Sequence, residues 1–193
     1  MNYNDIITNV DIYGLEKAVQ RSKYPMSTDP ATVTSEVTGG VNARGRTAAG
    51  TGHNNFLCGI IVQFDLTFTI KAWTEAERYH FFDIISSQST MHKIAKMDIE
   101  KSCIEYVSEE IIEIVKRLVA KYERTKAPED YLKLLYNVPA GLRLTAGMTT
   151  NYLQLKTIYA QRKNHRLPEW RAFCDWIETL PFCDWITQQE AEK

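Results

Sequence analysis

The clearest pattern in the chain is an alternation of apolar and polar side chains across residues 60–70. One face of this stretch carries the large apolar residues Ile60, Val62, Phe64, Leu66, Phe68 and Ile70. A period of two residues with one apolar face is typical of a strand in an antiparallel sheet that is covered on one side. We therefore predict a central strand at residues 60–70.

Around this strand, apolar residues recur at the spacing of amphipathic helices. In the segment 72–85, for example, one broad apolar stripe is formed by Trp73, Ala76, Phe81, Ile84 and Ile85. We expect helices at about residues 14–23, 72–85, 108–124, 128–135, 149–162 and 168–179. One sheet among many helices predicts a single α+β domain over residues 1–193.

Residues 25–52 interrupt these patterns with a segment rich in Gly, Ser and Thr that has no hydrophobic period. A connection of this length inside one domain is usually functional or disordered. Its Arg44 and Arg46 lie among glycines whose backbone N–H groups could surround a phosphate, although the spacing is not that of a P-loop. We predict a flexible loop at about 25–52, with a lid that contacts a ligand as the alternative.

The composition excludes several classes of protein. The 23 basic and 24 acidic residues give a net charge of −1, which argues against a general nucleic-acid-binding protein. No apolar run approaches the roughly 20 residues of a membrane span, and the first residues do not resemble a secretion signal. The cysteines, none in CxxC spacing, indicate reduced thiols and no zinc site. We expect a cytoplasmic protein without a metal.

Four segments together resemble the flavin-dependent thymidylate synthases. They are EKAVQRSKYP (16–25), GHNNFLCG (52–59), QSTMHKIA (88–95) and NVPAGLRLTAGMTTNYLQLKTIYAQRKNHRLPEW (137–170). The resemblance covers most of the chain and implies a central antiparallel sheet flanked by helices. It also implies a homotetramer whose ligand sites form between subunits, with FAD as a candidate cofactor and a uridine nucleotide as the family's substrate.

The resemblance implies roles for individual residues. Arg21 and Ser22 match positions close to the nucleotide, and His53 matches a histidine that approaches the flavin. Asn151, at a helix start, matches a residue whose amide bonds the flavin. Arg162 matches an arginine that reaches the substrate base across the subunit boundary, and His165 follows it in a matching segment. A cation at a helix end contributes little stability, so Arg162 is expected to matter for ligand binding rather than for folding.

The family's signature is an Arg-His-Arg triplet, with a glutamine three residues before it and a serine that follows it after seven intervening residues. Here Gln88 precedes the triplet Met91-His92-Lys93, and Ser102 comes one residue later than the pattern requires. Methionine has no donor, and lysine lacks the planar fork that binds oxyanions bidentately. Losing one such arginine costs about 1.5–3 kcal/mol, which is a tenfold to more than hundredfold loss of affinity.

The sequence thus predicts a nucleotide-binding protein with a degenerate catalytic motif and no assigned catalytic residue. By analogy with phage-encoded relatives, it could sequester a host nucleotide signal in the host cytoplasm as a counter-defence protein. An active synthase that methylates deoxyuridylate and a vestigial structural oligomer are the alternatives. The candidate ligand-binding residues are Arg21, Ser22, Arg44, His53, Gln88, His92, Lys93, Ser102, Asn151, Arg162 and His165.

Overall fold

Two long strands form the middle of the structure, a computed structural model that describes residues 1–188. Strand β2 (Ile61–Thr69) pairs antiparallel with β4 (Arg143–Asn151) over their whole length, without a register shift. The edge strands β1 (Ile7–Tyr13) and β3 (Phe82–Ser87) complete a sheet in the order β1-β2-β4-β3. All its pairings are antiparallel.

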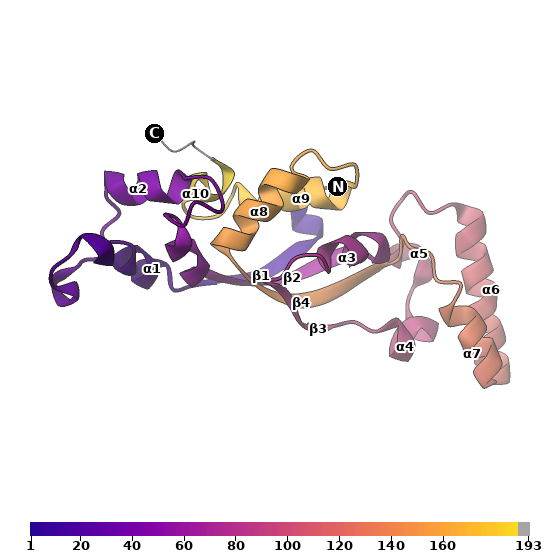
Figure 1. Cartoon of the computed structure of the whole chain (residues 1–193). Coiled ribbons are helices and arrows are strands. Elements are labelled where there is room, and N and C mark those ends of the chain that lie inside the picture. The colour runs from indigo at the N-terminus through magenta and orange to yellow at the C-terminus, as the bar shows by residue number, and fades with distance from the viewer. Residues whose placement is uncertain (189–193) are drawn as a thin grey trace.

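The helices fall into three groups along an elongated molecule (Figure 1). Over one face of the sheet lie α3 (Ile70–Ala76), α8 (Tyr152–Arg162) and α9 (Pro168–Ile177). At one end are α1 (Leu15–Arg21), α2 (Gly39–Arg46) and α10 (Asp184–Thr187). At the opposite end are α4 (Thr90–Lys93), α5 (Ile99–Ser102), α6 (Glu109–Thr125) and α7 (Pro128–Leu135). Short 3-10 turns, among them η3 (Pro30–Thr32), η4 (Asn55–Gly59) and η5 (Ile94–Lys96), join these elements.

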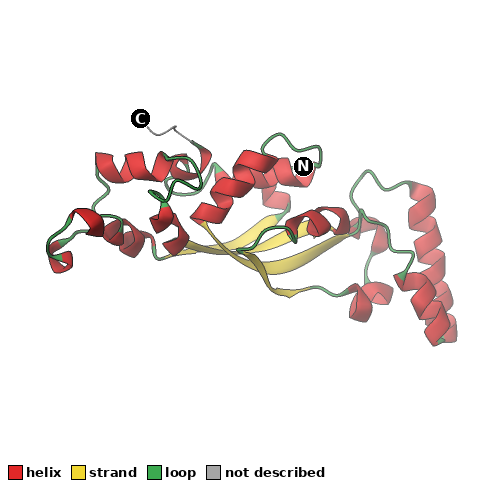
Figure 2. Ribbon diagram, in the orientation of Figure 1, coloured by secondary structure: helices red, strands yellow, loops and turns green. Residues whose placement is uncertain are grey.

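The main core lies between the apolar face of β2 and helix α9. Phe64 packs on Trp176 with ring centroids 4.8 Å apart, and Phe68 packs on Trp170 at 4.9 Å. A second, smaller core lies among the helices α4 to α7 at the other end, around Val115 and Leu134. Figure 2 shows this end as a group of helices joined to the sheet by loops and by the ends of β3 and β4.

Buried Lys156 fixes the opposite end. Its Nζ, on α8, donates to the carbonyl oxygens of Gly45 at 2.9 Å and Trp185 at 2.8 Å. The two acceptors belong to α2 and α10, so one ammonium group joins three helices. Arg46 adds an ion pair to Asp184 at 2.6 Å between α2 and α10.

Several predictions of local structure are confirmed. The strand predicted at 60–70 is β2, and its apolar face is buried. The helices predicted at 14–23, 108–124, 128–135, 149–162 and 168–179 correspond to α1, α6, α7, α8 and α9. The α+β class is therefore correct.

The helix predicted at 72–85 is wrong in its second half. Helix α3 ends at Ala76, and β3 begins at Phe82 and pairs with β4. Ile84 and Ile85 are exposed rather than part of an apolar stripe. Their β-branched side chains favour a strand, and the long-range pairing with β4 outweighs the local helical spacing.

The segment 25–52 contains more regular structure than its composition suggests, including η3 and helix α2. The hydroxyl oxygen of Thr38 accepts a hydrogen bond from the Val41 N–H and so caps α2 at its N-terminus. Val41 and Gly45 are buried beneath neighbouring elements. Contacts with distant elements stabilise α2. For this reason the helix forms although its sequence has no hydrophobic period. The flexibility of the segment stays a prediction.

Candidate functional site

A cavity of about 860 Å³ lies where β4 ends and α8 begins, and we call it the Asn151 cavity. Its walls come from the loop before η4, from the start of β2 and from the first turns of α8. The residues that line it are Ala49, Gly50, Gly52, Asn55, Cys58, Ile61, Phe81, Asn151, Leu153, Gln154 and Thr157.

Asn151 is positioned by both elements that meet at this cavity. It is the last residue of β4, paired opposite Ile61, and only 9% of its surface is exposed. Its Oδ1 accepts a hydrogen bond from the Gln154 N–H at 2.9 Å, so the same side chain caps α8. This bond fixes the orientation of the carboxamide and occupies an oxygen lone pair.

The loop that forms the other wall is held by Asn54, a residue only 1% exposed. Its Nδ2 donates to the carbonyl oxygens of Thr47 at 2.8 Å and Ala48 at 3.1 Å. His53 precedes it in this loop and is exposed, so it lies beside the cavity rather than among its lining residues. The loop is thus fixed from within and presents glycine backbone to the cavity.

The described residues that line the Asn151 cavity include no charged side chain. Phe81, Ile61 and Leu153 supply apolar surface, and Asn55 and Gln154 supply amides. Such a lining suits a flat, uncharged ring that also makes a few directed hydrogen bonds. A phosphate group needs donors of positive charge, which must come from elsewhere.

Two of the predicted residues lie together at the α1–α2 end. The Nη2 of Arg44 lies 3.4 Å from the Ser22 hydroxyl. Arg44 also lines a cleft of about 490 Å³ with Lys23 and several hydroxyl-bearing residues. Arg21, in the last turn of α1, is exposed and is not among the residues that line this cleft.

The degenerate signature lies on the other side of β4. Gln88 continues β3: its Oε1 accepts from the Thr145 N–H at 2.9 Å and its N–H donates to the Thr145 carbonyl oxygen at 2.9 Å. Beyond it, Met91 is 58% exposed, and His92 and Lys93 are exposed on α4. Thr145 and Asn151 are six residues apart on one strand, which corresponds to about 20 Å. The signature and the Asn151 cavity therefore do not meet within one chain.

Ser102 lies further into the helical end of the molecule, at the C-terminus of α5. Its carbonyl oxygen accepts a hydrogen bond from Arg143 Nε at 3.4 Å, and the Lys101 carbonyl accepts from Arg143 Nη2 at 2.6 Å. These bonds join α5 to the start of β4. The backbone of Ser102 thus contributes to the contact between α5 and β4.

Arg162 is buried and bound to residues of its own chain, whereas we expected it to extend across a subunit boundary. Only 9% of its surface is exposed. Its Nη1 pairs with Glu75 Oε2 at 2.7 Å and its Nε donates to the Tyr79 hydroxyl at 2.7 Å. The guanidinium also lies 4.8 Å from the centre of the Trp170 ring. This network joins α8, α3 and α9, so the expectation that Arg162 matters little for folding is wrong. A contact between Arg162 and a ligand stays a prediction.

His165 completes the same network. The Leu167 N–H donates to its Nδ1 at 3.2 Å, and its Nε2 lies 2.9 Å from Arg162 Nη1 and 3.2 Å from Glu75 Oε2. Burial lowers the pKa of His165 below its usual value, and the charge of Glu75 only partly opposes this shift. Burial would raise the pKa of Glu75, but the hydrogen bond from Lys71 and the charges of His165 and Arg162 outweigh it and hold that pKa below its usual value.

Comparisons with known proteins identify the architecture. No protein-family model matches the chain, and no curated protein matches it by sequence. Two crystal structures of flavin-dependent thymidylate synthase from Helicobacter pylori, both with FAD and dUMP, do match it in structure. Each superposes with a TM-score of 0.69, at 12% and 13% sequence identity. The matches cover 90% and 93% of this chain and 94% and 97% of the synthase chains. The chain has the fold of the flavin-dependent thymidylate synthases.

This result confirms the fold implied by the sequence resemblance. Sequence reasoning did not single out Phe81, Leu153, Gln154 or Asn54 as part of the site. Phe81 had been assigned to a helix, and the amides have no motif that separates them from ordinary surface residues. Position next to Asn151, and the register of β2 with β4, would have been needed to find them.

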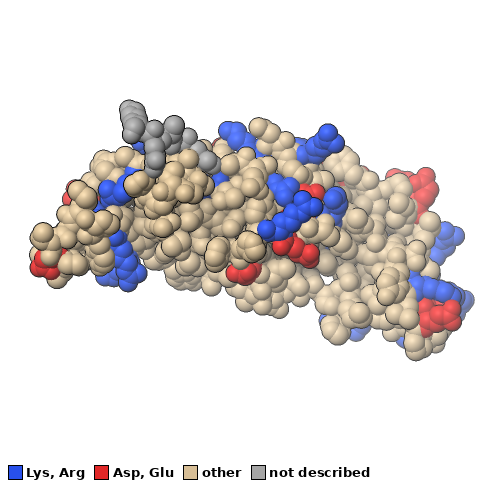
Figure 3. All heavy atoms as spheres, viewed as in Figure 1, with Lys and Arg blue, Asp and Glu red and all other residues tan. Residues whose placement is uncertain are grey.

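Residues 1–188 contain neither a membrane-spanning helix nor a metal-binding cluster. No helix in that range is long and apolar enough to cross a membrane. The same range holds no group of three or more His, Cys, Asp or Glu side chains placed to bind a metal. On the face shown in Figure 3, basic and acidic side chains are scattered and do not form a continuous basic stripe.

We expect Arg162→Ala to lower the free energy of unfolding by on the order of 2 kcal/mol, because it removes one charged partner of a shielded carboxylate that Lys71 and His165 still face. Urea unfolding followed by circular dichroism measures the effect. Arg166→Ala, which removes an exposed cation four residues later, is the control and should change stability by less than about 0.5 kcal/mol.

The same pair of variants makes a pH test. Because the pKa of Glu75 is lowered in the folded chain, its stabilising effect is present above the usual value of 4.5 and is lost as the pH falls below it. The destabilisation by Arg162→Ala should therefore shrink below that pH. Equal stability of the Arg162→Ala and Arg166→Ala proteins at neutral pH would contradict the network described above.

Proposed function

We propose that this chain binds a nucleotide-derived ligand whose ring lies in the Asn151 cavity. The observation that carries the proposal is the combination of an uncharged cavity, the exposed ring of Phe81 and a carboxamide held rigid by its capping bond. The volume of about 860 Å³ lies within the range of about 300–1,000 Å³ that is typical of small-molecule sites. The likeness to synthases with FAD and dUMP bound supports a nucleotide as the ligand class.

The complete site, in this proposal, forms between copies of the chain. The signature residues and the Asn151 cavity are separated along β4, so a second copy must supply one of them. Exposed apolar side chains on several elements support association, among them Phe81 at 63%, Ile85 at 59% and Tyr136 at 86%. A homotetramer, as the resemblance implies, is the expected assembly.

FAD fits the Asn151 cavity only in part. The apolar and amide lining suits a flavin or adenine ring, whereas the described residues there offer no cation for the diphosphate. FAD binding would need charges from a second copy or from the α1–α2 end. We therefore assign no chemical step to a flavin.

Binding without turnover fits the signature better than catalysis does. Where the family has arginine, Met91 offers no donor and Lys93 offers a point charge that forms no ion pair within residues 1–188. A ligand held by the remaining polar groups would be sequestered unchanged. A role as a phage protein that captures a host nucleotide signal rests on analogy and extends this proposal.

An active synthase is the second candidate. It is favoured by the near-complete structural overlap, 90% of this chain with 94% of the synthase chain. The two candidates differ in whether deoxyuridylate is methylated, so an assay separates them directly.

For the binder, Asn151→Asp is the most informative change, because the carboxylate keeps the acceptor that caps α8 but removes the amide donor. We expect nearly unchanged stability and at least about tenfold weaker binding of the nucleotide that the purified protein releases on denaturation. Mass spectrometry identifies that nucleotide and calorimetric titration measures its affinity.

Asn164→Asp is the matched control, since it makes the same change at an exposed position just past the other end of α8. It should bind like the wild type. The proposal is overturned by a wild-type protein that neither releases a nucleotide nor binds FAD or deoxyuridylate. It is also overturned if both variants bind equally well.

We further expect no methylation of deoxyuridylate in an assay with flavin, reduced nicotinamide and methylene-tetrahydrofolate, because the bidentate contacts of the signature are missing. Product formed by the wild-type chain would establish the synthase instead. The double variant Met91→Arg with Lys93→Arg then tests the cause: activity that appears only in this variant assigns the loss to the signature.

A further inference from the structure

The cleft between α1, η3 and α2 has the opposite chemical character to the Asn151 cavity. Its lining combines cations with hydroxyl groups: Lys23, Met26, Ser27, Thr28, Thr32, Val33, Thr34, Thr38 and Arg44. No carboxylate is among these residues, and no residue is shared with the lining of the Asn151 cavity. We call it the Arg44 cleft.

The two cations of the Arg44 cleft are not neutralised by any carboxylate of residues 1–188. Within residues 1–188, neither Lys23 nor Arg44 forms an ion pair, whereas Arg46, two residues later, pairs with Asp184 at 2.6 Å. Lys23 donates to the Thr34 carbonyl oxygen at 2.9 Å and to the Thr34 hydroxyl at 3.4 Å. Among residues 1–188, the side chain of Arg44 reaches only the Ser22 hydroxyl at 3.4 Å. Much of the donor capacity of a guanidinium and an ammonium is therefore unused.

One buried nitrogen of the Arg44 guanidinium also lacks a hydrogen-bond acceptor. Its Nε is buried and has no hydrogen-bond partner in the structure. Beside it, Gly40 lacks the Cβ that would lie 3.5 Å from Arg44 Nη1 and 3.9 Å from the Thr38 hydroxyl. The glycine thus leaves space next to a charged donor and a hydroxyl group.

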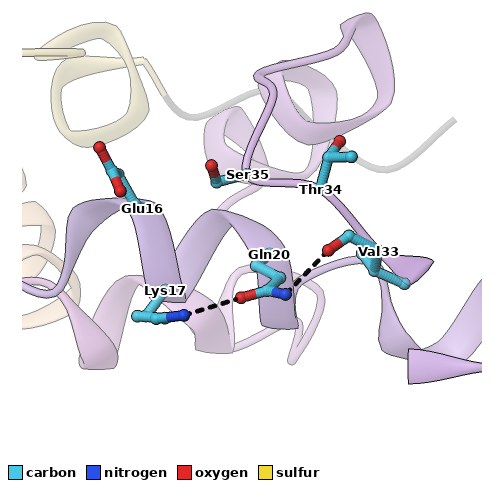
Figure 4. A pocket seen from close by; sticks show the side chains of 6 residues that line it. All are labelled: Glu16, Lys17, Gln20, Val33, Thr34 and Ser35. Atoms are coloured by element: carbon cyan, nitrogen blue, oxygen red, sulfur yellow. Dashed lines mark hydrogen bonds between the residues drawn. The ribbon is translucent and has the colours of Figure 1, made fainter. Parts of the chain in front are cut away.

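The cleft is formed before any ligand arrives. Figure 4 shows the neighbouring pocket on α1, where Gln20 Nε2 donates to the Val33 carbonyl oxygen at 2.8 Å and Lys17 Nζ approaches Gln20 Oε1 at 3.4 Å. The bond from Gln20 to Val33 and the bond from Lys23 to Thr34 fix the segment that forms one wall, whereas Lys17 contacts Gln20 and not this segment. The Thr38 cap fixes the start of α2, which forms the other. A ligand would not have to order the walls, which favours affinity.

We propose that the Arg44 cleft binds a phosphate group. The Ser27 and Thr32 hydroxyls already donate to the Asp29 carbonyl oxygen. Those of Thr34 and Thr38, in contrast, act as acceptors and keep a hydrogen to donate. A tetrahedral dianion is the ligand that matches a planar guanidinium, an ammonium and these two hydroxyl donors at once. Free phosphate and the phosphate of a nucleotide share this chemistry. The proposal stands apart from the nucleotide-binding proposal, because it concerns different residues and a charged ligand group.

Titration of the full-length protein with inorganic phosphate tests the proposal, with sodium chloride at the same ionic strength as the reference. Calorimetry gives the affinity, and the rise of Tm with phosphate concentration gives an independent measure. Lys23→Met should weaken phosphate binding at least about tenfold. Lys17→Met removes the same charge from α1 outside the cleft and should bind phosphate like the wild type.

Arg44→Lys keeps the charge and removes the planar fork, so it should also weaken phosphate binding while its Tm without phosphate shows whether it folds. The proposal fails if phosphate has no effect beyond that of chloride. It fails equally if Lys23→Met and Lys17→Met bind phosphate with the same affinity.

A comparison of inorganic phosphate with deoxyuridylate identifies the source of the phosphate group. A ligand that spans both sites should bind the wild type more tightly than phosphate and lose that advantage in Asn151→Asp. Equal affinities would assign the cleft to free phosphate. Inorganic phosphate itself should bind Asn151→Asp and the wild type alike, so phosphate binding can succeed where nucleotide binding fails.

Discussion

The unbroken pairing of β2 with β4 is the constraint on which the arrangement of the site depends. It runs from Ile61 opposite Asn151 to Thr69 opposite Arg143. One end of this pair holds the Asn151 cavity, and the other carries Arg143, whose guanidinium binds the α5 carbonyl groups. Because a paired strand cannot shorten, the two ends stay apart in a single chain. Polar groups at the two ends can therefore act on one ligand only if separate copies bring them together.

Much of the fold could be predicted from local periodicity. Strand β2 and helices α6, α7 and α9 show their period because one face is apolar and packs on the chain, whereas in α8 the buried face also carries Lys156 and Arg162. The edge strand β3 has both faces exposed apart from Phe82, so no alternation marks it. Strand β4 carries small and hydroxyl-bearing residues whose burial depends on β2. Helix α2 depends on Trp185 and Lys156, more than a hundred residues away in the chain. Long-range pairing of this kind leaves no local trace.

The site was predictable to a smaller extent. Asn151 could be singled out because the resemblance matches it and Arg162 to the start and the end of one predicted helix, 149–162. The structural role of Arg162 could not be predicted, because a cation at a helix end gives no sign in the sequence that Glu75 and Tyr79 bind it. Arg44 was noticed among glycines, but its cleft depends on hydroxyl groups that are brought together by η3 and the Thr38 cap. The residue types indicated which groups could bind a ligand, whereas the side chains that surround each of them could be read only from the fold.

A subunit-mixing experiment tests the shared site most directly. Asn151→Asp damages the cavity, and Lys93→Glu damages the signature end, so each protein alone should bind the released nucleotide weakly. When the two are refolded together, sedimentation should show oligomers, and nucleotide binding should return in a fraction of the sites, because an intact cavity of one copy meets an intact signature of another. A mixture that binds no better than its components, or a wild-type chain that sediments as a monomer at micromolar concentration, would contradict the account.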